Sequence, residues 1–448
     1  MAGKEFLGHP AGLYVLFTTE MWERFSYYGM RALLVMYMTK YLLFDPSRAA
    51  EVLGYKSLEG ILVGLFGPMN IQQMSSQIYG LYTGFVYLTP FFGGILADRL
   101  LGQYRTVYLG GVLMAIGHFL MASEKMFLLA LLFLILGNGC FKPNISTQVA
   151  GLYPEGDPRR DGAFTIFYMG INLGAFFSPL ICGTLGQTVG WHWGFGAAGI
   201  GMMIGLFSYW LGSDLIPRDT LTEKARAEES RKLTKGEWNS IYVLIVLCFL
   251  NIMFWAIYEQ QGNTLQLWAD DKTNWKMLGW EIPSSWFQSF NPLMIFIFAP
   301  ILNVFWSWQA KRGTEPSSVV KMGIGCLLCG GAYILMILAA KAVPGVDRGS
   351  VLWLLGTVFI FTMGELYLSP IGLSLVTKVA PKPIMSMMMG VWFLSSFIGN
   401  YMTGYLGTFY TKMPKETFFL ICCGLGIGTG LVFFMIKGKI NRVLGKFV

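Results

Sequence analysis

Ionisable residues stand in the middle of the first long apolar segment of the chain. Two acids and two arginines follow the apolar run at 13–17, namely Glu20, Glu23, Arg24 and Arg31. Each such charge costs roughly 2.5–3.5 kcal/mol at the centre of a membrane-spanning helix, so these groups require partners or water. Together with Tyr27 they fall at offsets 0, 3, 4, 7 and 11, which form one stripe of a helix. The stripe predicts a polar pathway across a bilayer, with structural ion pairs between helices as the alternative.

Further polar residues stand within later apolar segments. Lys142 follows a long apolar run and precedes a proline, which bends a helix. A buried lysine needs a carboxylate, loses its proton, or extends to the end of its helix. Glu259 follows Trp255 by one helical turn, and Glu365 precedes Ser369 by the same spacing. We therefore expect several segments to contribute to one polar interior.

Three carboxylates near two cations predict proton coupling. Burial raises the affinity of a carboxylate for a proton and a neighbouring cation lowers it, so moving the cation changes the protonation state. Separating a buried ion pair is costly unless a proton neutralises the acid. Entry of a proton is therefore predicted to open a gate formed by Glu20, Glu23 and Glu259 with Arg24 and Lys142.

The same charges predict a ligand that carries both signs. Arg24, Arg31 and Lys142 would meet a carboxylate, and Glu365 would meet an ammonium group. The other candidate contacts are two amides and five aromatic residues with polar atoms: Asn172, Asn291, Tyr27, Tyr28, Tyr87, Trp255 and Trp392. The two tryptophans have a simpler interpretation as packing residues.

The elements that position these residues are apolar helices. The 448 residues are 54% hydrophobic and only 13% charged, which indicates an all-α integral membrane protein. Stretches of about 20 apolar residues span a bilayer. Twelve are predicted, at 11–41, 72–97, 106–123, 126–150, 162–188, 194–213, 238–268, 285–310, 318–341, 350–378, 384–410 and 416–437. We expect a short surface helix within 42–71.

The predicted spans fall into two halves. A charged stretch at 214–237 separates a six-helix bundle at 1–213 from a second one at 238–448. Its mixed charges without an apolar run predict a solvated cytoplasmic linker. Two similar halves are typical of transporters that bind their substrate near the midplane, and the charged spans stand at equivalent places in the two halves.

Charge outside the spans predicts the orientation. Lys and Arg are roughly twice as frequent on the side of the termini as on the other side, so both termini are expected in the cytoplasm. The first apolar segment is too long and too charged for a signal-peptide core. We expect a multi-pass protein of the cytoplasmic membrane that functions as a monomer.

Other chemistry lacks support in the sequence. The seven cysteines lie in apolar spans, and Cys326 and Cys329 have a redox or metal spacing without an acid or histidine beside them, which favours packing. The glycine run at 426–430 follows no strand, which favours helix packing over nucleotide binding. We find no nucleophile constellation, metal spacing or nucleic-acid signature. No enzyme, metal or cofactor is predicted, with protons as the coupling ion.

Five motifs carry a family resemblance. They are Glu20-x-x-Glu23-Arg24-Phe25-Ser-Tyr27-Tyr28-Gly29, Phe141-Lys142-Pro143-Asn144, Phe167-Tyr168-x-x-Ile171-Asn172-x-Gly174, Phe254-Trp255-x-x-x-Glu259-Gln260 and Gly364-Glu365-x-x-x-Ser369-Pro370. In this order they resemble the motifs of proton-dependent oligopeptide transporters, a branch of the major facilitator superfamily. The resemblance implies twelve transmembrane helices and import of di- and tripeptides by alternating access.

The resemblance also implies roles for individual residues. Proton coupling would involve Glu20, Glu23 and Arg24, and Lys142 with Glu259 would form a gating salt bridge between the halves. Arg31 and Lys142 would attract the peptide carboxylate, and Glu365 with Asn172 would hold the amino end. The remaining pocket residues would be Tyr27, Tyr28, Tyr87, Asn291, Trp255, Ser369 and Trp392.

One feature departs from many bacterial relatives, which carry two extra helices between the halves, because 214–237 is too short for a hairpin of spans. Three alternatives stay open. A transporter of a nitrate-like anion would give Glu365 no ammonium partner, and a proton-driven drug exporter would leave the motifs of the second half unexplained. A membrane enzyme would need catalytic groups within the spans.

Overall fold

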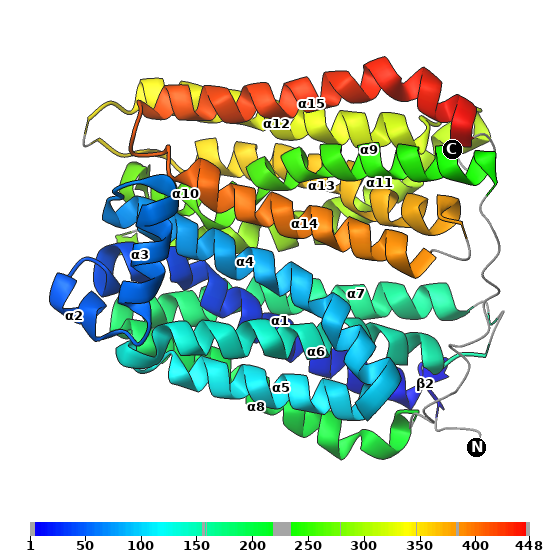
Figure 1. The fold of residues 1–448 in the computed structure, drawn as a ribbon, viewed down its shortest axis with the longest axis horizontal. Helices are drawn as coiled ribbons and strands as arrows, with labels where there is room; N and C mark the ends of the chain where they lie inside the picture. Colours follow the sequence, from blue (N-terminus) through cyan, green and yellow to red (C-terminus); the bar gives the residue numbers. More distant parts are fainter. Residues whose placement is uncertain are drawn as a thin grey trace. The chain divides into compact units, whose positions relative to one another are not determined.

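Long helices make up most of the computed structural model, which describes residues 5–154, 157, 159–217, 234–277, 279–345, 347–381 and 385–444. The helices of 18 or more residues are α1 (Ala11–Tyr37), α4 (Ile71–Leu96), α5 (Gln103–Leu120), α6 (Phe127–Gly151), α7 (Arg159–Ser178), α8 (Trp191–Leu211), α9 (Lys235–Tyr258), α11 (Phe290–Lys311), α12 (Ser318–Ala342), α13 (Leu352–Val379), α14 (Met385–Gly407) and α15 (Lys415–Leu444). Each overlaps one predicted span. The all-helical membrane fold is confirmed (Figure 1).

Most of these helices have the length and the apolar composition of membrane-spanning helices. Within the described residues, nine helical stretches are long and apolar enough to cross a membrane. Helix α1 is not among them, because Glu20, Glu23, Arg24 and Arg31 interrupt its apolar sequence. The count of twelve spans stays a prediction.

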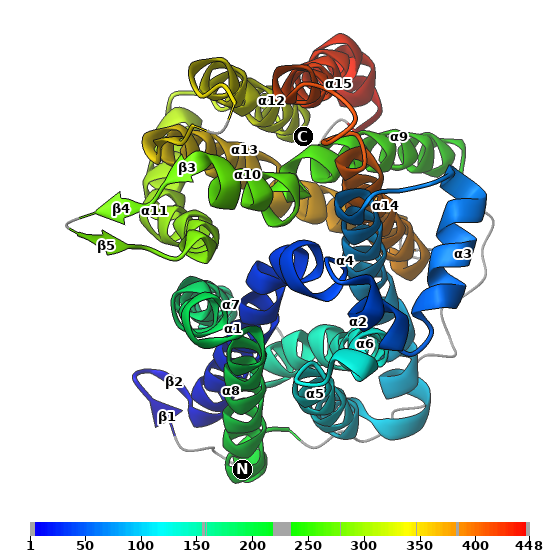
Figure 2. The same cartoon turned by 90° about the vertical axis from the view of Figure 1, so that its left-hand side faces the viewer.

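The chain forms two compact units. The first contains residues 1–223 and 277–292, and the second contains 224–276 and 293–448. In the first unit α1 packs along α7 and α8, and α6 packs on α4 and α5 (Figures 1 and 2). In the second unit α12 packs on α13 and α15, and α9 packs on α14. Most of the predicted linker, 218–233, lies outside the described residues.

Short elements fill the connections. Two short helices, α2 (Pro46–Glu51) and α3 (Tyr55–Phe66), replace the single surface helix expected in 42–71. The two-residue strands pair as β1 (Glu5–Phe6) with β2 (His9–Pro10), β3 (Thr273–Asn274) with β6 (Gly349–Ser350), and β4 (Lys276–Met277) with β5 (Trp280–Glu281). Five described turns of π-helix or 3₁₀-helix connect other helices: η1 (Met38–Leu42), η2 (Ala97–Leu101), η3 (Glu124–Met126), η6 (Ser213–Leu215) and η9 (Ser284–Ser289). Further turns follow α7 and α9.

Several predicted spans include irregular turns. After α7 the chain continues as two π-helical turns, η4 (Pro179–Gly183) and η5 (Leu185–Val189). The predicted seventh span, 238–268, lies within one apolar helical stretch over Gly236–Lys272, but this stretch is not a single regular α-helix. Helix α9 ends at Tyr258, a 3₁₀ turn, η8, covers Glu259–Gly262, and α10 runs over Thr264–Lys272.

Glycines allow close packing of the helices. A side chain at Gly426 would lie 2.5 Å from the Cα of Gly330, so α15 and α12 are in backbone contact there. At the other end of the run, a side chain at Gly430 would lie 3.0 Å from the carbonyl oxygen of Gly323 on α12, so the prediction of helix packing is confirmed at both ends, whereas Gly428 has open space around it. Cys326 and Cys329 are buried free thiols on α12, as the packing interpretation requires.

Candidate functional site

The first part of the candidate site is a buried ion cluster on α1. Glu20, Glu23 and Arg24 are at most 3% exposed. The Arg24 guanidinium donates to both carboxylate oxygens of Glu23, with Nη2 at 2.7 Å from Oε1, and its Nε lies 3.3 Å from Oε1 of Glu20. Two carboxylates therefore share one guanidinium. The cluster can accept one proton without acquiring a net positive charge.

Close packing of α7 on α1 buries this cluster. At Gly174 a side chain would collide with the backbone of Met21 and would lie 2.9 Å from the nitrogen of Phe25. Only glycine allows α7 to approach α1 this closely beside the cluster. A side chain at Gly29 would likewise lie 2.6 Å from Sγ of Cys182 in η4. The glycines of the two motifs therefore position the charged face of α1.

Arg31 lies two turns further along α1. Its Nε donates to the hydroxyl of Tyr79 on α4 at 2.9 Å, and its guanidinium carbon lies 5.9 Å from the ring centre of Tyr28. The ring centres of Tyr27 and Tyr28 are 5.1 Å apart, edge to face. A cation held by aromatic rings and a hydroxyl is suited to binding a carboxylate.

Lys142 projects from α6 beside α4. Its Nζ lies 4.7 Å from the centre of the Tyr87 ring, and it is close enough to Glu20 to interact electrostatically. Nδ2 of Asn144 donates to the carbonyl oxygens of Gly93 on α4, at 3.2 Å, and of Cys140, at 2.7 Å. Asn144, which belongs to the same motif as Lys142, thereby attaches α6 to α4.

The two predicted amides are placed differently. Asn172 is buried on α7 and donates to the carbonyl oxygen of Tyr168 at 3.0 Å, within its own helix. Asn291 is half-buried in the first turn of α11 and belongs to the first unit. With these residues, ten of the predicted contacts lie in the first unit: Glu20, Glu23, Arg24, Tyr27, Tyr28, Arg31, Tyr87, Lys142, Asn172 and Asn291.

The second unit contains the other five predicted residues. Glu365 on α13 accepts a hydrogen bond from the hydroxyl of Tyr258, the last residue of α9. Glu259 is 3% exposed and begins the 3₁₀ turn after α9. Trp255, half-buried, packs edge to face on Tyr258 at 5.6 Å between ring centres. The structure thus brings Glu365 and the end of α9 together.

The remaining two residues lie on α13 and α14. Ser369 is half-buried one turn after Glu365. Trp392 is 6% exposed, and a side chain at Gly372 would lie 2.5 Å from its ring. This contact favours the packing interpretation of Trp392.

A network of polar side chains stabilises the break after α9. Nε2 of Gln260 donates to the carbonyl oxygen of Thr403 on α14 at 2.9 Å, and its Oε1 accepts from the hydroxyl of Thr264 at 2.8 Å. Asn263 also donates to the Thr403 carbonyl, at 3.3 Å. These residues are fully buried, and the hydroxyl of Thr403 donates to the carbonyl oxygens of Trp255 and Ala256 at 3.3 Å, so the network provides partners for carbonyl groups at the end of α9.

Two residues of the site were missed from the sequence. Tyr79, the partner of Arg31, stands two helical turns before Tyr87 on α4, and this spacing was a usable signal. Tyr258, the partner of Glu365, stands next to Glu259 inside a quoted motif. Its contact depends on the end of α9 at that residue, which the apolar composition of the span did not indicate.

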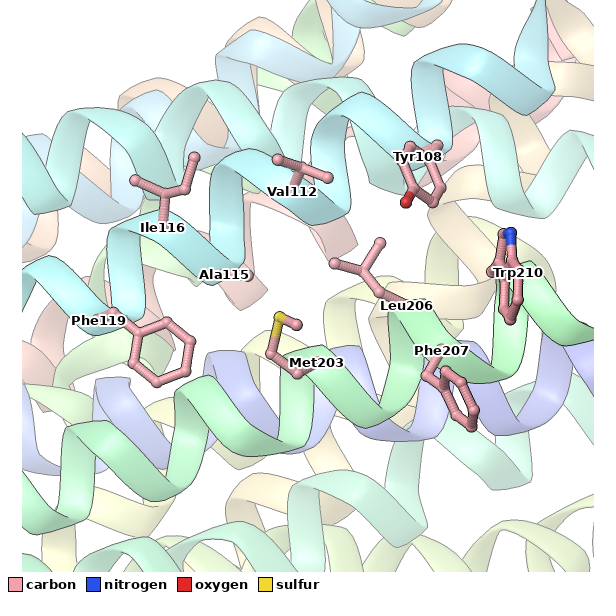
Figure 3. Close-up of a pocket in the computed structure, with 9 residues that line it drawn as sticks. All are labelled: Tyr108, Val112, Ala115, Ile116, Phe119, Met203, Leu206, Phe207 and Trp210. Atoms are coloured by element: carbon pink, nitrogen blue, oxygen red, sulfur yellow. The ribbon is translucent and has the colours of Figure 1, made fainter.

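An apolar groove of about 500 Å³ lies between α5 and α8 (Figure 3). It is lined by Tyr108, Val112, Ala115, Ile116, Phe119, Met203, Leu206, Phe207 and Trp210. The lining includes no charged residue and none of the predicted contacts. Its apolar residues are typical of a bilayer-facing surface, so we give the groove no part in the chemistry.

Helices of membrane-spanning length that bury ionisable clusters away from their apolar surfaces define a multi-pass membrane transporter. The profile of the POT family matches residues 104–243 and 224–421. The di-/tripeptide transporter of Lactococcus lactis subsp. cremoris is 34% identical over 507 residues, which cover 99% of this chain and 98% of the relative. The chain therefore belongs to the POT family.

Solved structures agree with this assignment. A crystal structure of a peptide transporter POT in complex with sulfate superposes with a TM-score of 0.85 at 33% identity and covers 98% of this chain and 97% of that chain. A structure of a POT mutant in complex with alafosfalin gives a TM-score of 0.84 at 34% identity over 99% and 97% of the two chains. The fold is that of this transporter family.

Proposed function

We propose that the protein is a proton-coupled symporter that imports di- and tripeptides by alternating access. The observation that carries the proposal is the cluster of two carboxylates around one guanidinium, buried in a helix of a transporter. Such a cluster can exchange a proton as its surroundings change. The Lactococcus relative is a di-/tripeptide transporter, which supports the substrate class.

The residue roles follow the chemistry of a zwitterionic peptide. Glu20, Glu23 and Arg24 take part in proton coupling, with the carboxylates as the groups that exchange the proton, and Lys142 forms a gating ion pair with Glu259. Arg31 and Lys142 attract the peptide carboxylate. Glu365 and Asn172 bind the amino end, and the peptide side chains pack against the aromatic residues. The hydroxyl of Tyr258 orients the Glu365 carboxylate for this contact.

The cellular setting completes the proposal. The protein works as a monomer in the cytoplasmic membrane with both termini in the cytoplasm. Its ligands are peptides and protons, and it needs no cofactor, metal or nucleic acid. Basic residues concentrate on the predicted cytoplasmic loops, which supports the orientation.

Uptake of labelled dialanine into proteoliposomes tests the proposal. Accumulation is expected with an inward proton gradient, and its loss is expected when a proton carrier collapses the gradient. Absence of accumulation by a folded protein would refute peptide symport. Uptake of nitrate or sulfate under the same gradient would then identify an anion transporter.

A further inference from the structure

The start of α11 belongs to a different unit from the rest of that helix. Residues 277–292 come after α9 and α10 of the second unit, yet they pack into the first unit, whereas residues from Leu293 onward belong to the second. The segment that enters the helix is η9, over Ser284–Ser289. Helix α11 is therefore a covalent connection whose first turn is attached to the first unit.

Four side-chain hydrogen bonds make this attachment. Gln187 in η5 accepts from the backbone nitrogen of Ser285 and donates to the hydroxyl of Ser284, both at 2.9 Å. Nε1 of Trp286 donates to the hydroxyl of Thr184 at 2.9 Å. The hydroxyl of Ser289 donates to the carbonyl oxygen of Phe176 on α7 at 2.7 Å.

The turns that follow α7 fit closely against η9. The hydroxyl of Thr184 donates to the carbonyl oxygen of Leu180 at 2.5 Å, which leaves its oxygen lone pairs directed to accept from Trp286. A side chain at Gly183 would lie 2.7 Å from Cβ of Ser285, so only glycine allows the approach. Ser284 and Ser285 are buried, which makes these polar contacts costly to leave unpaired.

We propose that these bonds form a polar clasp that must release and re-form in each transport cycle. The clasp consists of Gln187, Thr184 and the Phe176 carbonyl with residues 284–289. The proposal rests on the proposed function, because alternating access requires the two units to move against each other. A helix shared by both units resists that movement while its first turn is held. The clasp thus sets the balance between the conformations of the transporter.

Thiol labelling tests whether the clasp opens. Ser285 is fully buried, so Ser285→Cys is expected to react slowly with a membrane-impermeant maleimide in a background without the native cysteines. Adding Gln187→Ala or Gly183→Ala should raise the labelling rate about fivefold. Loss of one hydrogen bond of ordinary net strength shifts the equilibrium between the closed and the open clasp by about this factor. Gly196→Ala is the matched control, because a side chain there meets open space. Equal rates in all variants would overturn the proposal.

A ligand response separates a clasp from local loosening. Dialanine shifts the conformational equilibrium of a transporter, so it should change the labelling rate of Ser285→Cys without further mutation. A rate that dialanine leaves unchanged, in protein that transports dialanine, would assign these bonds a purely structural role.

A reversible lock tests whether release is required. Gly183→Cys with Ser285→Cys brings two Cβ positions to 2.7 Å, and a shift of about 1 Å gives disulfide geometry. The oxidised protein should lose dialanine uptake, and reduction should restore it. Transport by the oxidised protein at the reduced rate would show that the clasp stays closed during the cycle. Failure of the cysteine-free protein that retains Gly183 and Ser285 to transport dialanine would count against the proposed function, while the labelling rates still test the clasp.

Discussion

Replacement of Glu23 by glutamine tests whether the α1 cluster couples peptide to protons. Glu23 is fully buried and accepts from Arg24 through both carboxylate oxygens. Glutamine keeps the shape of the side chain but removes its charge and turns one acceptor into a donor. Arg24 retains Glu20 at 3.3 Å, so its charge stays compensated. We expect a loss of about 1–3 kcal/mol in the free energy of unfolding, below the ~3–5 kcal/mol for an unpaired buried charge.

The main effect expected of Glu23→Gln is a loss of dialanine accumulation. A gradient of one pH unit supplies about 1.4 kcal/mol per proton, which drives about tenfold accumulation for one coupled proton. The wild-type protein should reach that ratio in proteoliposomes. Glu23→Gln should stop at equal concentrations inside and outside, while it still exchanges internal for external dialanine. Glu51→Gln, at an exposed residue of α2, should behave as wild type.

Two outcomes would refute this reasoning. If exchange and accumulation fall in the same proportion in a folded variant, Glu23 is structural. If the variant still accumulates dialanine about tenfold, the charge of Glu23 takes no part in coupling. Thermal unfolding in detergent distinguishes a folded variant from a misfolded one.

The remaining predictions concern the other charges and the broken helix. Glu365→Gln should weaken uptake of dialanine at least about tenfold more than that of N-acetyl dialanine, because only the first has an ammonium group, and equal losses would remove Glu365 from that role. Lys142→Ala should abolish gradient-driven uptake, because it removes both the proposed partner of Glu259 and a cation for the peptide carboxylate, and wild-type accumulation by the folded variant would refute the gate. Gln260→Ala should cost about 1–3 kcal/mol and lower the thermal midpoint relative to Gln103→Ala, because it leaves the Thr264 hydroxyl unpaired.

The helices were predictable because a bilayer imposes a simple rule. Each long helix overlaps an apolar stretch, since unpaired backbone groups are not tolerated in lipid. The stripe on α1 was also predictable, because charges in such a helix must face an interior. The structure places Glu20, Glu23 and Arg24 together as their spacing indicates.

The partners on other helices were not predictable from periodicity. Periodicity indicates which face of a helix is polar, but the contact of Arg31 with Tyr79 depends on how α1 and α4 pack. The attachment of η9 to η5 is similar, because Gln187 and Ser285 are separated by 98 positions in the chain. A single sequence contains no measure of such distant pairs.

The break after α9 could not be predicted from the apolar composition of the segment. No proline or helix-ending motif precedes Glu259, so apolar composition favours a continuous helix. The hydroxyl of Thr403 on α14 donates to the carbonyl oxygens of Trp255 and Ala256, and the buried amides of Gln260 and Asn263 donate to the Thr403 carbonyl, which attaches the interrupted end of α9 to α14. The break places Glu259 at the carboxyl end of α9, where the helix dipole disfavours a negative charge. A cation paired with this carboxylate, as in the proposed ion pair with Lys142, would offset that cost, and a lysine introduced at that position would instead be favoured by the same dipole.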